Sequence, residues 1–72
     1  MQEYNYSKLL GRIKECGFTQ VSLAKRLGID ASTLNLTINN KRNFRQNEIL
    51  RIAEILCIQP IEITSYFFVQ KL

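Results

Sequence analysis

Apolar residues recur every three or four positions along most of the chain, the spacing that predicts amphipathic α-helices. The pattern divides into five predicted helices: Ser7 to about Cys16, Gln20 to Leu27, about Ala31 to Asn39, about Gln46 to Leu56, and Pro60 to about Phe68. Short connections between them suit a compact all-α domain. We therefore expect a single domain over residues 1–72, with residues 1–6 as a loose N-terminus and residues 69–72 as the C-terminal end.

The second and third predicted helices are the part around which the rest of the chain is organised. Gly28 tolerates the left-handed conformation that ends a helix, and Asp30 is expected to cap the helix that follows. The residues expected to face inward are Val21, Leu23, Ala24 and Leu27 in the second helix and Ala31, Leu34 and Ile38 in the third. Two short helices across so tight a turn predict a helix-turn-helix.

Several other residues are of types that are typical of helix ends and of loops packed on a core. Ser7 and Thr19 precede apolar helical runs and are predicted to cap them. Pro60 suits the first position of a helix, where no backbone N–H is needed. The polar, basic loop between the third and fourth helices contains one large apolar residue, Phe44, which we expect to hold the loop against the core.

The chain is basic, with ten Lys and Arg residues against six Asp and Glu and a net charge of +4. This balance favours a polyanionic partner, although many small soluble domains share it. No stretch approaches the about 18 apolar residues of a membrane span, and no signal peptide opens the chain. We expect a cytoplasmic protein with no membrane contact.

Metal, cofactor and catalytic groups are scarce. There is no His, and Cys16 and Cys57 alone are too few to hold zinc, so we expect two semi-buried reduced thiols and no cofactor. The carboxylates are scattered among basic residues, and Ser22 and Lys25 lie three apart without an oxyanion site. The sequence therefore favours a non-enzyme.

The helix-turn-helix carries a family resemblance. Gln20, Ala24, Gly28, Ile29 and Leu34 resemble the pattern of the Cro and lambdoid-repressor-like family, and the flanking YSKLLGRIKECGFTQ and NNKRNFRQNEILRIAEIL resemble its small phage-encoded Cro-like branch. The resemblance covers residues 6–68. It implies a five-helix, lambda-repressor-like DNA-binding domain of a bacteriophage, whose third helix enters the major groove, usually as a dimer.

The sequence departs from this family at three positions. Thr37 stands where a second core residue of the third helix is usual and Ile38 follows it, which predicts a helix rotated or extended by one residue. Arg45 replaces a Ser or Thr cap, and Cys57 replaces a Gly before the fifth helix.

The resemblance and the charge pattern together indicate DNA contacts. The residues expected to contact phosphates are Thr19, Gln20, Lys41, Arg42 and Arg45. The residues expected to read bases are Ser32, Thr33, Asn35, Leu36 and Asn39. Each set also has a simpler interpretation, as a solvated basic loop and as an ordinary helix surface.

Two functions remain open at this stage, the first as our main interpretation and the second as its alternative. The first is a transcriptional regulator, a repressor in a lysogeny switch, that binds double-stranded operator DNA. The second is an antirepressor that keeps the helix-turn-helix fold and binds the phage repressor protein, because the third helix lacks the Arg, Lys or Gln that make strong base contacts. Four apolar residues near the C-terminus cannot all face one small core: Tyr66, Phe67, Phe68 and Val69. We expect two of them in the core and the others either in the contact of a weak homodimer or packed on Tyr4 and Tyr6.

Overall fold

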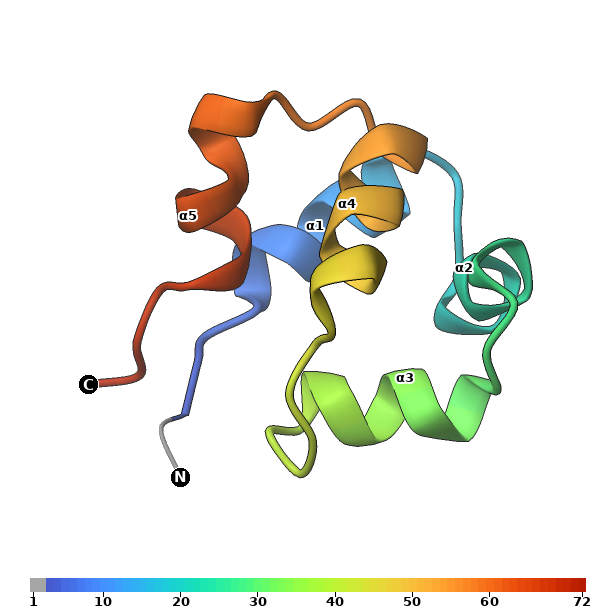
Figure 1. The fold of residues 1–72 in the computed structure, drawn as a ribbon, viewed down its shortest axis with the longest axis horizontal. Helices are drawn as coiled ribbons and strands as arrows, with labels where there is room; N and C mark the ends of the chain where they lie inside the picture. Colours follow the sequence, from blue (N-terminus) through green and yellow to red (C-terminus); the bar gives the residue numbers. More distant parts are fainter. Residues whose placement is uncertain (1–2) are drawn as a thin grey trace.

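Five α-helices make up the fold in the computed structural model, which describes residues 3–72 (Figure 1). They are α1 (Ser7–Glu15), α2 (Gln20–Leu27), α3 (Ala31–Ile38), α4 (Gln46–Ile55) and α5 (Ile63–Phe67), with a 3₁₀ turn, η1 (Pro60–Glu62), directly before α5. The predicted all-α, five-helix fold is confirmed. The last predicted helix differs in detail, because Pro60 opens a 3₁₀ turn rather than an α-helix.

The core lies where all five helices meet. The most deeply buried large apolar side chains come from all five helices and from the residue directly after α4: Leu9, Leu23, Leu34, Ile52, Leu56 and Phe67. Burial of each such side chain contributes about 1.5–3 kcal/mol. In Figure 1, α3 lies along one edge of the molecule and α5 lies on the other side of α4, so the two helices present separate surfaces.

At the start of α2 and at the turn into α3, the helix-turn-helix agrees with the prediction from sequence. Oγ1 of Thr19 accepts a hydrogen bond from the backbone N–H of Ser22 at 3.1 Å, which confirms the predicted cap of α2. Gly28 ends α2 in the left-handed conformation, with φ of 76°. The N–H of Ile29 then bonds to the carbonyl of Ala24 at 3.0 Å and directs the chain into α3.

Two predicted caps are wrong. Asp30 occupies the N-cap position of α3 with extended backbone, but its side chain accepts no capping hydrogen bond. Ser7 is the first residue of α1 rather than its cap. Oδ1 of Asn5 instead accepts from the backbone N–H of Ser7 at 2.9 Å and from its hydroxyl at 2.6 Å.

The inward faces of α2 and α3 differ from the prediction at two positions. Val21 was expected in the buried stripe of α2, but it is 66% exposed. Thr37 is fully buried, and Ile38 packs only partly against the core. α3 therefore keeps the usual phase of the family, with Thr37 itself in the core position, and the predicted rotation or extension of this helix is wrong.

The predicted loose N-terminus is wrong for residues 3–6, while residues 1 and 2 lie outside the described part. Tyr4 forms an antiparallel bridge with Gln70. The backbone N–H of Asn5 donates to the carbonyl of Val69 at 2.7 Å. The side-chain amide of Asn40 donates to the carbonyl of Tyr4 at 2.9 Å and accepts from its N–H at 2.8 Å. This segment thus joins the end of α3 to the C-terminal residues.

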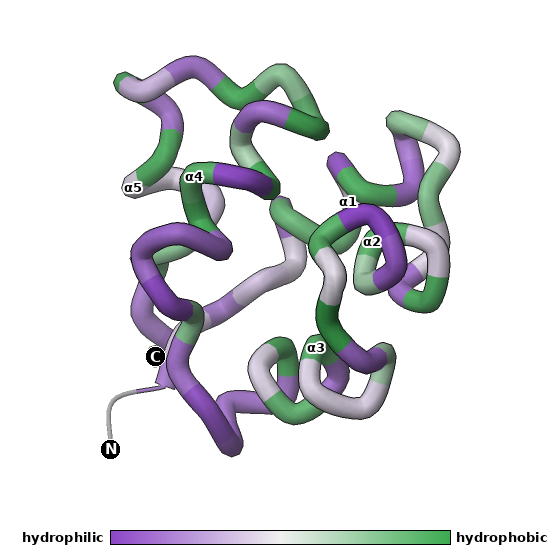
Figure 2. Tube along the Cα trace, turned by 45° about the vertical axis from the view of Figure 1, so that its right-hand side comes forward, coloured by the Kyte–Doolittle hydropathy of each residue, from purple (hydrophilic) through white to green (hydrophobic). Residues whose placement is uncertain are grey.

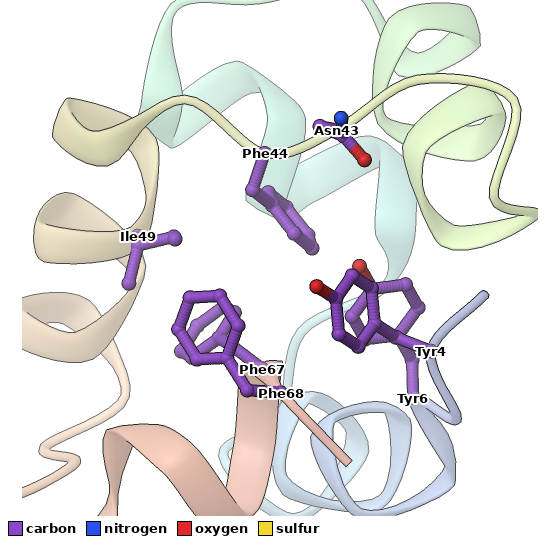
Figure 3. Close-up of a pocket in the computed structure, with 7 residues that line it drawn as sticks. All are labelled: Tyr4, Tyr6, Asn43, Phe44, Ile49, Phe67 and Phe68. Atoms are coloured by element: carbon purple, nitrogen blue, oxygen red, sulfur yellow. The ribbon is translucent and has the colours of Figure 1, made fainter. Parts of the chain in front are cut away.

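Phe44 holds the loop after α3 against the core, as predicted. Its ring meets the rings of Tyr6 and Phe67 edge to face, with 5.4 Å between ring centroids in each pair. Figure 3 shows Phe44 extending from the loop toward the two tyrosines and toward Phe67 at the end of α5. The loop therefore has a fixed place between α3 and α4.

Both cysteines lie at the surface of the fold. Cys16 and Cys57 are both exposed free thiols, so the prediction that they are semi-buried is wrong. Cys57 has a positive φ of 55°, which explains why related sequences favour Gly at this position.

Among residues 3–72, no helix has the length and apolar character needed to cross a membrane.

Candidate protein-binding surface on helix α3

The outer surface of α3 carries most of the predicted base-reading residues. Ser32, Asn35, Leu36 and Asn39 are exposed there, whereas Thr33 is partly buried. No residue from Ala31 to Ile38 is charged. Figure 2 shows α3 mainly in white and green, whereas the loop that follows it is purple. The surface is thus neutral, with hydrophilic residues concentrated beside it.

Three side-chain amides on this surface bind one another, and we call Gln20, Asn35 and Asn39 the amide network. Nδ2 of Asn39 donates to Oδ1 of Asn35 at 3.2 Å and to its backbone carbonyl at 2.9 Å. Nδ2 of Asn35 donates in turn to Oε1 of Gln20 at 3.3 Å. Both polar atoms of the Asn35 amide therefore have a partner within the protein, and each keeps one further hydrogen-bonding position, a second N–H on Nδ2 and a second lone pair on Oδ1.

Leu36 is the apolar centre of this surface. It is 45% exposed on α3, between the amide network residues Asn35 and Asn39 in sequence. An exposed aliphatic side chain among neutral amides resembles the composition of a protein interface more than that of a DNA-binding helix.

Arg42 is not available to a phosphate, because it forms a network with Thr37 and Glu48. Nη1 of Arg42 donates to Oγ1 of Thr37 at 2.8 Å and to Oε1 of Glu48 at 3.0 Å. Nη2 donates to Oε2 of Glu48 at 2.8 Å. This Arg42 network satisfies the buried hydroxyl of Thr37, and it removes one of the predicted phosphate contacts.

Glu48 is the acidic centre of the Arg42 network and was not singled out from the sequence. The hydrogen bonds from Arg42 hold the pKa of its carboxyl below the usual value of 4.5, against the opposing effect of burial. Oε1 also accepts from the backbone N–H of Arg45, the N-cap residue of α4, at 2.9 Å, which is the contribution of the acidic residue in a capping box. The sequence signal that could have identified Glu48 is an acidic residue at the third position of the predicted fourth helix.

The other predicted phosphate contacts divide into two groups. Thr19 and Gln20 use their side chains within the protein, in the cap of α2 and in the amide network. Lys41 and Arg45 are exposed, and neither forms an ion pair within 4 Å among residues 3–72. Two cations therefore remain of the predicted basic cluster.

A shallow hollow of about 460 Å³ lies beside Leu36, and we call it the α3 hollow. It is lined by Gly28, Ile29, Asp30, Thr33, Leu36, Arg42, Arg45 and Glu48. Aliphatic side chains from the turn and from α3 thus border both acidic and basic groups.

A second hollow, of about 350 Å³, lies near the chain ends (Figure 3). It is lined by Tyr4, Tyr6, Asn43, Phe44, Ile49, Phe67 and Phe68. Of the four C-terminal apolar residues, Tyr66 and Phe67 are buried in the core, as expected for two of them, while Phe68 and Val69 are exposed. The ring of Phe68 meets that of Tyr4 edge to face, with 5.8 Å between centroids, so the predicted packing on the N-terminal tyrosines is present.

Metal chemistry has no support among the described residues. Residues 3–72 contain no group of three or more Cys, Asp or Glu side chains placed to hold a metal ion. A further hollow of about 400 Å³ adjoins the aromatic hollow near the chain ends, and it is lined by Phe44, Gln46, Ile49, Leu50, Ile63 and Phe68.

Comparison with known proteins places this geometry in context. A family model described as a protein of unknown function (DUF739) matches residues 2–70. The chain is also similar to the modulator of repression (MOR) of the temperate bacteriophage TP901-1 from Lactococcus lactis, known from a solution structure. The two share 38% identity with a TM-score of 0.78, over 90% of this chain and 88% of that one. No curated protein sequence matches significantly.

Proposed function

The chain belongs to the family of proteins of unknown function (DUF739), and we propose that it modulates repression in a temperate phage by binding the phage repressor protein. The similarity to a phage modulator of repression supports the regulatory role and a non-enzymatic function. It favours the antirepressor of the two functions left open by the sequence. The surface of α3 supports the choice of a protein partner.

The observation that carries this proposal is the neutral outer surface of α3. DNA affinity comes largely from cations placed on phosphates, and base reading relies on free hydrogen-bonding groups. Here Arg42 is engaged with Glu48, and Asn35 is engaged within the amide network. What remains exposed at the centre is Leu36, whose burial against another protein would contribute favourably.

Operator DNA is the second candidate, and one observation favours it. Lys41 and Arg45 flank α3 as exposed cations without ion pairs among residues 3–72. Two such groups resemble the backbone contacts of a helix-turn-helix protein. They provide less phosphate neutralisation than the three cations that the sequence suggested.

The two candidate functions are distinguished by measuring the affinity of the same protein for the repressor and for DNA. Calorimetric titration with the repressor of the same phage is expected to give a defined complex. Fluorescence anisotropy on DNA from the phage's own promoter region is expected to give only weak binding, equal to that on unrelated DNA. Sequence-specific DNA binding without repressor binding would contradict the proposal.

Leu36 provides the test of the surface. Leu36→Asp should weaken repressor binding by about 100-fold or more, because it places a charge at the apolar centre of the contact. Ile61→Asp is the matched control, since Ile61 is 90% exposed and lies in η1, away from α3. Equal affinities of the two variants would exclude α3 as the binding surface.

A further inference from the structure

The α3 hollow contains four charged groups, but two of them neutralise each other. Arg42 and Glu48 form a bidentate ion pair, and each is largely buried. Their charges are therefore directed at one another rather than at a partner. The charged groups left for an external ligand are the carboxylate of Asp30 and the guanidinium of Arg45.

Asp30 and Arg45 are both exposed and both available. The side chain of Asp30 makes no capping hydrogen bond, although it stands at the start of α3. Neither residue forms an ion pair within 4 Å in the described part of the chain. The aliphatic side chains of Ile29 and Leu36 line the same hollow. The hollow thus offers one anion, one cation and an apolar surface.

We infer that the α3 hollow receives a segment of the repressor that places a basic side chain on Asp30, an acidic side chain on Arg45 and an aliphatic group on Ile29 and Leu36. The inference rests on the function proposed above and names the chemistry of the partner at that surface. Ion pairs of opposite polarity fix the orientation of a bound segment, and they discriminate against partners with the wrong arrangement of charge.

The same arrangement disfavours a polyanion. A nucleic acid carries only negative charge along its backbone, so it can satisfy Arg45 but is repelled by Asp30. A peptide segment carries both signs and can satisfy both groups. The presence of Asp30 in the hollow therefore favours a protein segment as the occupant.

Charge reversal tests the inference directly. Asp30→Lys and Arg45→Glu should each weaken repressor binding by about 10-fold or more, and the neutral variants Asp30→Asn and Arg45→Gln by less. Raising the ionic strength should reduce the differences among these variants and wild type, because exposed charges are screened. Arg45→Gln also covers the case in which Arg45→Glu disturbs the neighbouring Arg42–Glu48 pair.

Matched controls change the net charge equally at a distance from the hollow. Glu54→Lys, near the C-terminal end of α4, matches Asp30→Lys, and Lys14→Glu, in α1, matches Arg45→Glu. Both controls should bind the repressor with nearly wild-type affinity. If the Asp30 and Arg45 variants behave like their controls while Leu36→Asp still loses binding, the repressor does not pair with these two charges, which overturns this inference and leaves the proposed function standing. If the wild-type protein does not bind the repressor, the proposed function itself fails.

Discussion

Arg42 and Glu48 form a bidentate ion pair, with Nη2 of Arg42 2.8 Å from Oε2 of Glu48 and Nη1 3.0 Å from Oε1. The pair connects the loop after α3 to the first turn of α4. Because Nη1 also donates to Thr37, the same guanidinium fixes the loop to the buried side of α3. The position of the exposed α3 surface therefore depends on a polar network beneath it.

Removal of Arg42 should destabilise the protein more than removal of its neighbour. Arg42→Ala removes the cation paired with the buried Glu48 carboxylate, which keeps only the backbone N–H of Arg45, and we expect a loss of about 2–3 kcal/mol in the free energy of unfolding. Lys41→Ala, at an exposed position, should change it by less than about 0.5 kcal/mol. Urea unfolding measures both variants. Equal stabilities would show that the network is not a structural determinant.

Glu48 should contribute a pH-dependent part of the stability. Its pKa is lowered in the folded state, chiefly by hydrogen bonds from Arg42, so its contribution is complete above the usual carboxyl pKa of 4.5 that it regains on unfolding. That contribution is lost as the pH falls through the lower pKa of the folded protein. The free energy of unfolding should therefore decrease less steeply on acidification in Glu48→Gln and Arg42→Ala than in wild type. An unchanged slope in both variants would contradict this assignment.

Replacement of Cys57 by Gly should stabilise the protein. Cys57 adopts φ of 55°, in the left-handed region where a Cβ costs about 1–2 kcal/mol. Allowing for the greater flexibility of Gly in the unfolded chain, Cys57→Gly should gain about 0.5–1 kcal/mol. Cys57→Ala removes the thiol but keeps the Cβ, so its melting temperature should remain near that of wild type. A gain in both variants would assign the effect to the thiol.

Asn40 should hold the N-terminal segment through its side chain. Asn40→Gly retains the positive φ of this position but removes both amide hydrogen bonds to Tyr4, and we expect a loss of about 1–2 kcal/mol. Asn40→Ala should lose more, because it adds backbone strain. Hydrogen exchange at Asn5 should become faster in both variants. Unchanged exchange there would show that the pairing of Asn5 with Val69 holds the segment by itself.

The features that could be predicted from sequence are those set by neighbouring residues. The helical spacing of apolar residues located all five helices, and the Thr19 cap, the left-handed Gly28 and the Phe44 contact followed from local chemistry. These features depend on interactions within a few positions or on a single large apolar group. They correctly gave the helix-turn-helix and its place in the chain.

The features that could not be predicted depend on side chains that meet across the fold. The hydroxyl of the buried Thr37 has two partners, the carbonyl of Thr33 one turn earlier in α3, to which it donates, and Arg42 on the following loop, which donates to it. The N-terminal segment is ordered because Asn40 reaches Tyr4, 36 positions away. The engagement of Arg42 by Glu48 changed the set of available cations, and periodicity carries no signal for such a pairing.

The most direct test of the central claim, that the outer surface of α3 binds the repressor, is a nuclear magnetic resonance titration of isotopically labelled protein. Addition of the phage repressor should shift the backbone resonances of residues 32–39 and the side-chain amide resonances of the amide network, Gln20, Asn35 and Asn39. Promoter DNA at the same concentration should leave them nearly unchanged. Shifts confined to residues around the aromatic hollow, or shifts of the α3 surface with DNA alone, would contradict the account.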